Sequence, residues 1–161
     1  MLRAFFYMKF IKNDPIDINL LRPIYVDEDI LLKAWPSAKI PFCEDQWLRW
    51  FENSEEVETH SFLLQEDGEM RAHGALKMYT IEPGLCYMCL IAVKKEYQSQ
   101  GLGRKLIHEI LLYCHKSLGL SEVYLLVYKE NKRALDFYRK LGFQLVDGEN
   151  PLRLRINLGH S

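Results

Sequence analysis

An uninterrupted apolar run at residues 85–93, followed by a glycine turn and a helical stretch, constrains the fold more than any other feature of the sequence. A run without any charge is typical of a strand that is covered on both faces. Apolar residues at 101–118 recur every three or four positions, as in an amphipathic helix. A second apolar run occupies residues 123–128. Strand, helix and strand in this order predict a crossover that joins two parallel strands.

The rest of the chain consists of shorter segments with strand or helix patterns, which predict an α/β (α+β) fold with a mixed sheet. Strands are expected at residues 16–22, 61–65, 72–81, 144–146 and 152–158. Further helices are expected at 27–36, after Pro41 and at 131–141. An Asp-Gly turn at 66–69 indicates an antiparallel hairpin. Residues 1–12 are interpreted as an extra N-terminal segment, either a short leader or an early strand.

Composition restricts the chain to ordinary globular classes. The 161 residues are expected to form a single domain, and 48% hydrophobic with 27% charged residues exclude a disordered or fibrous chain. A formal net charge of -1 favours neither nucleic acid nor a membrane as partner. No run approaches the ~18 apolar residues of a membrane helix. Four scattered cysteines do not suit a secreted disulfide scaffold, so we expect a cytoplasmic protein.

The glycine turn has the spacing Gln98-x-x-Gly101-x-Gly103 and lies between a strand and a helix N-terminus. Unpaired backbone N–H groups at such a terminus bind phosphate, and glycines let a phosphate approach the backbone. The same glycines also fit a plain tight turn. A Walker A loop is excluded because no Lys-Ser or Lys-Thr pair follows the second glycine. A Rossmann loop is excluded because position 106 is leucine.

Near neutrality conceals two regions of opposite charge. Residues 27–69 contain twelve acidic and three basic residues, whereas residues 94–140 contain ten basic and five acidic residues. The basic region includes the glycine turn and favours a polyphosphate ligand there. The acidic region favours a cationic partner. Solvated helix faces explain the same pattern without any ligand.

Two linked motifs carry a resemblance to a known family. The first is the run IAVKKEYQSQGLG at residues 91–103; the second combines Asn131, Ala134, Tyr138, Gly142 and Phe143. Together they resemble the signature of the GNAT superfamily of N-acetyltransferases, closely over residues 85–145 and by order of elements elsewhere. The resemblance implies a mixed, mostly antiparallel sheet of about six or seven strands. It also implies helices on both faces and a splayed parallel pair of strands in the centre.

The resemblance also implies acetyl-CoA as co-substrate and names the residues that would hold it. Backbone groups of a bulged strand at Ile91, Ala92 and Val93 would pair with the pantetheine arm, and Asn131 would contact that arm or simply cap a helix. Backbone N–H groups of the turn would bind the pyrophosphate; these belong to Gln98, Ser99, Gln100, Gly101, Leu102, Gly103 and Arg104. The side chain of Arg104 or Lys105 could reach a phosphate as well.

In the reaction that the resemblance implies, a neutral amine attacks the thioester directly, with no covalent enzyme intermediate. Tyr138 would protonate the departing CoA thiolate. Many family members carry a carboxylate on the strand before the turn, and residues 85–93 have none. The general base is therefore not assigned, and the candidates are Glu82, His73, Glu96 and solvent. No metal is expected, because Cys86 and Cys89 are three apart on a strand and point to opposite faces.

The expected function is N-acetylation of a primary amine. A non-catalytic CoA-binding module and transfer of a longer acyl group are the alternatives. The acceptor would be a small cationic molecule or a protein amine, bound by residues 27–57 and 79–85. Four aromatic residues either line that site or belong to the core: Trp35, Phe42, Trp47 and Trp50. The resemblance is also compatible with a homodimer.

Overall fold

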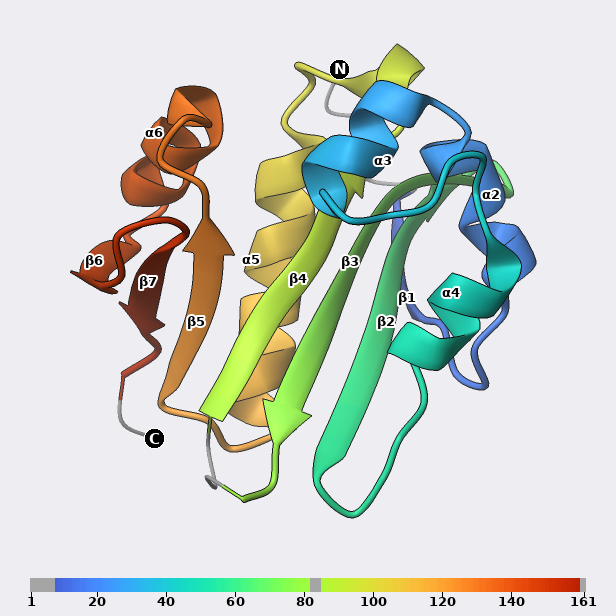
Figure 1. The fold of residues 1–161 in the computed structure, drawn as a ribbon. Coiled ribbons are helices and arrows are strands. Elements are labelled where there is room, and N and C mark those ends of the chain that lie inside the picture. Colours follow the sequence, from blue (N-terminus) through green and yellow to red (C-terminus); the bar gives the residue numbers. More distant parts are fainter. Residues whose placement is uncertain (1–7, 82–84, 160–161) are drawn as a thin grey trace.

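A computed structural model describes residues 8–81 and 85–159 and contains one seven-stranded sheet (Figure 1). The strand order across the sheet is β1-β2-β3-β4-β5-β7-β6. The strands are β1 Lys9–Lys12, β2 Val57–Glu66, β3 Glu69–Tyr79, β4 Leu85–Val93, β5 Glu122–Val127, β6 Gln144–Asp147 and β7 Leu152–Asn157. All neighbours are antiparallel except β4 and β5, which are parallel. The predicted mixed sheet is thus confirmed.

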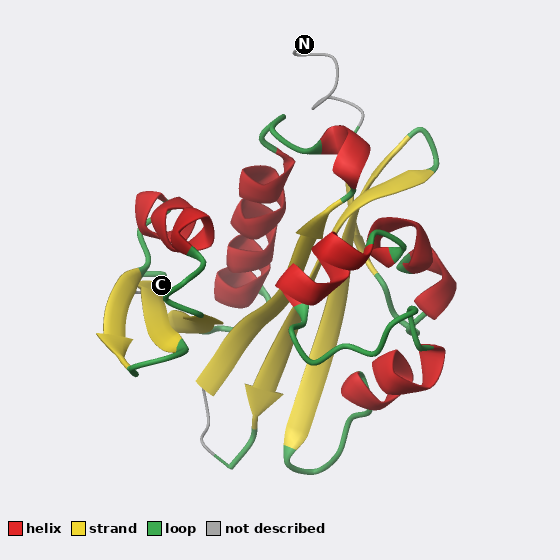
Figure 2. Ribbon diagram, turned by 45° about the horizontal axis from the view of Figure 1, so that its top comes forward, coloured by secondary structure: helices red, strands yellow, loops and turns green. Residues whose placement is uncertain are grey.

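Helices cover both faces of the sheet, as predicted. The helical segments are η1 Ile18–Leu20, α2 Arg22–Tyr25, α3 Glu28–Ala34, α4 Glu44–Trp50, η2 Lys95–Tyr97, α5 Leu102–Lys116 and α6 Lys132–Lys140. In Figures 1 and 2 the long helix α5 lies behind the sheet, whereas α2, α3 and α4 lie in front of it. No helix in the described ranges is both long and apolar enough to span a bilayer.

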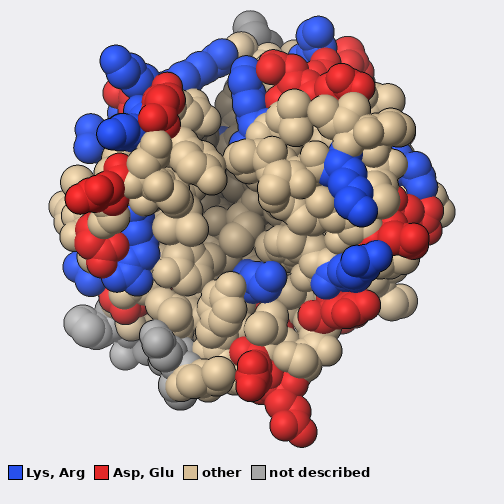
Figure 3. Space-filling view, in the orientation of Figure 1, with Lys and Arg blue, Asp and Glu red and all other residues tan. Residues whose placement is uncertain are grey.

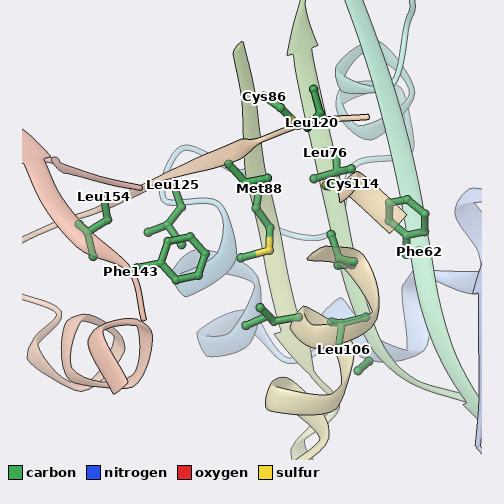
Figure 4. Close-up of a cluster of buried hydrophobic side chains, with 14 of the residues drawn as sticks. Phe62, Leu76, Cys86, Met88, Leu106, Cys114, Leu120, Leu125, Phe143 and Leu154 are labelled. Carbon is green, nitrogen blue, oxygen red and sulfur yellow. The ribbon is translucent and has the colours of Figure 1, made fainter. Parts of the chain in front are cut away.

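Each face of the sheet has its own hydrophobic core. The core behind the sheet joins α5 to the strands through Leu106, Ile110 and Cys114, and Figure 4 shows it continuing to Phe143 and Leu154. The core in front joins α2, α3 and α4 to the strands. Cys86 belongs to the core behind the sheet and Cys89 packs against the core in front. The two thiols therefore lie on opposite faces, as the strand spacing predicts.

The parallel pair in the centre of the sheet separates along its length. β4 and β5 are paired only at Tyr87 and Tyr124, near the start of both strands. Beyond this position the strands diverge toward the glycine turn, as Figure 1 shows between β4 and β5. This is the splayed pair that the resemblance predicted, and it leaves unpaired backbone on the facing edges of both strands.

The N-terminal third differs from the prediction at one element. Residues 16–22 form no strand; they contribute to η1 and the start of α2, and Asp17 caps η1 by accepting from the Asn19 N–H. Ile18, Leu21 and Ile24 are buried at a spacing of three, which is helical. Residues 9–12 form the edge strand β1, which agrees with the early-strand interpretation over that stretch.

Candidate active site

A β-bulge on β4 changes the direction of its side chains beside the separated strands. His73 of β3 pairs with Ala92, but Ala75 pairs with Cys89, so β4 contains one residue more than β3. Leu90 in this bulge has a φ of 54°, a left-handed conformation that costs a non-glycine residue about 1–3 kcal/mol. The resemblance placed the bulge at residues 91–93, and the structure centres it at Leu90.

A buried chain of hydrogen bonds holds the bulge in place. Tyr25 of α2 donates its hydroxyl hydrogen to the Leu90 carbonyl (2.8 Å), and its oxygen lies 2.7 Å from His73 Nδ1. His73 Nδ1 therefore carries the hydrogen of that second bond, and Nε2 accepts from the Ser61 hydroxyl at 2.9 Å. Asn13 donates to Ser61 in turn (3.3 Å). The bulge is thus tied to α2 and β2 through buried polar groups.

The glycine turn presents a series of free backbone N–H groups. The N–H groups from Ser99 to Arg104 have no hydrogen-bond acceptor among the described residues. Ser99 (φ 63°) and Gly101 (φ 82°) are left-handed, and Gly101 begins α5 without any side-chain cap. Such N–H groups at a helix terminus, together with the positive end of the helix dipole, favour an anion. The arrangement fits the predicted pyrophosphate site.

Space and charge around the turn also suit an anionic ligand. A methyl group on Gly103 would meet its nearest atom, Phe137 Cζ, at 3.5 Å, so the protein itself leaves room for a side chain there. Lys105 forms an ion pair with Glu109 (2.9 Å), whereas Arg104 is exposed and has no carboxylate partner among the described residues. Figure 3 shows Lys and Arg atoms across the top of a hollow in this face.

Asn131 and Tyr138 lie at the start and toward the end of α6, beside the separated strands. The Asn131 carboxamide oxygen caps α6 by accepting from the Ala134 N–H (3.2 Å), which leaves its amide nitrogen available. Tyr138 packs edge-on against Phe143, and its hydroxyl has no hydrogen bond to a described residue. Burial raises the pKa of Tyr138, and the nearby thiol of Cys89 raises it further when ionised. Tyr138 is therefore protonated at neutral pH.

The candidates for a general base lie in very different places. His73 is fully buried, both its ring nitrogens are hydrogen-bonded, and burial lowers its pKa to about 3. This geometry suits a structural role and does not suit proton transfer with a substrate. Glu96 lies in η2 and forms an ion pair with Lys94 at 3.3 Å. Glu82 lies outside the described residues.

The aromatic residues expected around the acceptor divide into two groups. Trp47 is completely buried and Phe42 stacks on it, so both belong to the front core. Trp35 and Trp50 instead line a surface pocket of about 350 Å³ on the side of α4. Cys89 lies on the same face, where burial raises the pKa of its thiol to about 12 and the Lys77 ammonium partly opposes that shift.

Sequence patterns gave no signal for the residues that hold the bulge. Tyr25 was not singled out, because the helix that carries it follows a segment interpreted as a strand. Ser61 lies in an ordinary strand pattern. The extra residue on β4 is invisible in a run where every side chain is apolar. These roles depend on contacts between segments far apart in the chain.

Curated relatives match parts of the chain. Spermidine N(1)-acetyltransferase of Escherichia coli strain K12 is 42% identical over 67 residues, which are 42% of this chain and 36% of that protein. The ribosomal protein bS18 alanine N-acetyltransferase of the same strain is 30% identical over 110 residues, 68% of this chain and 66% of that protein. The chain thus matches less than two thirds of the length of either relative.

Solved structures match the fold along nearly the whole chain. Spermidine N-acetyltransferase from Vibrio cholerae, in complex with CoA and spermine, superposes with a TM-score of 0.72 at 17% identity. That alignment covers 94% of this chain and 96% of the other. The profile of the Acetyltransferase (GNAT) family matches residues 25–143, which include α3, α4, the bulged strand, the glycine turn and α6. The chain therefore belongs to the GNAT acetyltransferase family.

Proposed function

We propose that the protein transfers the acetyl group of acetyl-CoA to a primary amine. The observation that carries the proposal is the separation of β4 from β5 after a single paired position, directly beside a turn in which six N–H groups have no acceptor within residues 8–81 and 85–159. An opened pair of strands offers backbone donors and acceptors to an extended ligand, as another strand would. Family membership supports the same donor.

In the proposed complex the coenzyme lies along three parts of the site. Its pyrophosphate accepts hydrogen bonds from the N–H groups of Ser99–Arg104, whereas the predicted Gln98 N–H already donates to the Lys95 carbonyl (3.4 Å). Its pantetheine arm pairs with the backbone of Ile91–Val93 on the edge that faces β5, where the Val93 carbonyl accepts from the Gln98 side chain (3.1 Å) before a ligand binds, and it contacts the amide nitrogen of Asn131. The thioester then lies between the bulge and Tyr138. Arg104, exposed and without a carboxylate partner among the described residues, is available to a phosphate.

The proposed reaction forms one bond and breaks another at the thioester carbon. The amine nitrogen attacks the carbonyl, the C–N bond forms, and the negative charge on the oxygen is stabilised by a backbone N–H of β4. The C–S bond then breaks and Tyr138 protonates the CoA thiolate. The proton lost from the amine passes to solvent, Glu82 or Glu96, because β4 has no carboxylate and His73 is enclosed. Solvent then returns a proton to Tyr138.

The names of the relatives support the chemical class of the acceptor, and the front face of the molecule supports the side from which it enters. One relative is named for spermidine and another for the alanine of a ribosomal protein, so small amines and protein amines are both represented. The acceptor would enter on the side of α3 and α4, where the pocket beside Trp50 opens.

Two measurements on the purified chain test the proposal. Calorimetry measures the binding of acetyl-CoA, and a thiol-release assay measures turnover with spermidine, leucine and an alanine-terminated peptide. Binding with thiol release on at least one amine supports the transferase. Binding without release on any amine favours a non-catalytic CoA-binding module, for which the missing strand carboxylate is the motivating observation. Competition between acetyl-CoA and longer acyl-CoAs decides which acyl group is transferred.

A further inference from the structure

The pocket on the side of α4 has a preformed wall. Its lining residues are Trp35, Lys39, Gln46, Arg49 and Trp50. Gln46 fixes the segment that follows α3, because its side-chain oxygen accepts from the Lys39 N–H (2.8 Å) and its amide donates to the Ser37 carbonyl (3.2 Å). Trp35 is held edge-on against the buried Trp47 at 5.2 Å. The pocket therefore needs little ordering before a ligand binds.

Two cations line this pocket, and a third lies against one of its tryptophans. Lys39 and Arg49 line it, and the Lys77 ammonium of β3 lies 4.8 Å from the centre of the Trp50 ring. Within the described ranges, none of the three has a carboxylate oxygen within 4 Å. Asp45 lies one helical turn before Arg49, yet the two form no ion pair.

Neighbouring cations on the same side of the molecule behave differently. Arg22 is paired with Glu44 at 2.6 Å, and Lys33 is paired with Asp29 at 3.0 Å. The acidic residues of α3 and α4 are thus engaged with other cations or lie away from the pocket lining. The excess of acidic residues in this part of the sequence does not produce an acidic pocket.

The pocket lies against the same front core as the bulge of β4. Trp50 and Cys89 pack against the same front core. Lys77, whose ammonium lies beside the Trp50 ring, is paired across the strands with Tyr87, two residues before Cys89. The pocket therefore lies on the face of the sheet that carries Cys89 and the bulge.

We propose that this pocket selects amine acceptors that carry a carboxylate close to the amine. The inference rests on the proposed function and narrows its substrate class to free α-amino acids or short peptides with an acidic side chain. The carboxylate would pair with Arg49, Lys39 or Lys77, and the apolar part of the acceptor would lie against Trp35 and Trp50. A polyamine would meet three like charges, which disfavours it.

Matched acceptors that differ by one charge test the proposal. Leucine is compared with leucinamide, and the peptide amide Ala-Glu-NH₂ with Ala-Gln-NH₂, by thiol release from acetyl-CoA. The first pair probes free amino acids and the second probes peptides; spermidine is the cationic control. Leucinamide has the less basic amine, so a preference for leucine cannot arise from a larger fraction of free amine. We expect roughly 10- to 100-fold higher kcat/KM for the charged member of at least one pair.

Variants of the pocket cations identify the groups responsible. Arg49→Gln and Lys39→Gln should lower kcat/KM for the carboxylate acceptor more than for its amide, so that most of the preference is lost. Lys116→Gln replaces an exposed cation at the end of α5, on the other face of the sheet, and should leave the preference intact. Equal rates within both pairs, a preference for spermidine, or a preference that is unchanged in Arg49→Gln, in Lys39→Gln and in Lys77→Gln would overturn the inference.

A binding measurement separates this inference from the proposed function. Fluorescence of Trp35 and Trp50 is followed during titration with N-acetylleucine and with N-acetylleucinamide, which resemble the product and require no turnover. Tighter binding of N-acetylleucine, lost in Arg49→Gln, supports the pocket assignment even if no amine releases thiol. Equal binding of the two ligands contradicts it, whatever the outcome of the thiol-release assay.

Discussion

At the scale of single residues, Tyr138 can be substituted so that turnover is affected while the stability of the fold is not. Tyr138→Phe keeps the edge-on packing against Phe143 and removes only the hydroxyl that would protonate the thiolate. We expect kcat to fall by about 10²- to 10⁴-fold with little change in the KM for acetyl-CoA or in the melting temperature. Steady-state thiol release measures both constants. Tyr113→Phe, on α5, is the matched control, and an unchanged kcat in Tyr138→Phe would remove the phenol from the reaction.

His73 makes a different prediction, about stability and pH. Its pKa is about 3 in the folded protein, whereas a histidine in an unfolded chain titrates near 6.5. The unfolded chain therefore binds more protons between these values. The contribution of His73 to the free energy of unfolding is complete above about pH 6.5 and is lost as the pH falls toward 3.

Urea unfolding at pH 7.5 and 4.5 measures this dependence. From His73 alone we expect a loss of about 2–3 kcal/mol between the two pH values. His73→Gln should be less stable at pH 7.5, because it disrupts the bonds to Tyr25 and Ser61, and should show a smaller difference between the two pH values. A residual slope is expected from His60, whose pKa burial also lowers. His108→Gln, exposed on α5, is the control, and a slope unchanged in His73→Gln would contradict the account.

At the scale of elements, Gly103 distinguishes a ligand-binding turn from a plain tight turn. Gly103 is helical and has room for a methyl group, so Gly103→Ala should stabilise α5 by up to about 1 kcal/mol. The same methyl group would occupy the space through which a pyrophosphate approaches the backbone. We expect a higher melting temperature together with at least tenfold weaker acetyl-CoA binding by calorimetry. A stabilised variant with unaltered affinity would favour the plain turn.

The elements that sequence predicts best are those whose signal is local. β4 has the bounds expected from its apolar run, and α5 differs from the expected helix by one residue at its start and two at its end. The pattern of apolar residues that predicts each element lies within the element itself. Residues 16–22 were predicted wrongly, since alternating apolar residues in so short a segment also suit helical turns. The bulge was expected from the resemblance alone; no local pattern marks it at Leu90, because it depends on Tyr25, 48 residues from His73 and 65 from Leu90 in sequence.

At the scale of the whole molecule, the sheet consists of two parts joined weakly at its centre. β1 to β4 form one part and β5, β7 and β6 form the other, and only Tyr87 and Tyr124 are paired between them. A ligand that pairs with the facing edges and binds the turn should therefore stabilise the folded chain. At one hundred times its Kd a ligand contributes about 2.7 kcal/mol, and for a chain of this size that raises Tm by about 5–10 °C.

Hydrogen exchange with two ligands locates this stabilisation along the chain. Acetyl-CoA should slow amide exchange both in the turn at Ser99–Arg104 and on the β4 edge at Ile91–Val93. ADP supplies a diphosphate without a pantetheine arm, so it should protect the turn and leave the strand edge unchanged. Protection of both segments by ADP would indicate a general tightening of the sheet. Protection of neither segment by acetyl-CoA would mean that the space between β4 and β5 holds no ligand arm, because a chain paired with those edges must shield their N–H groups.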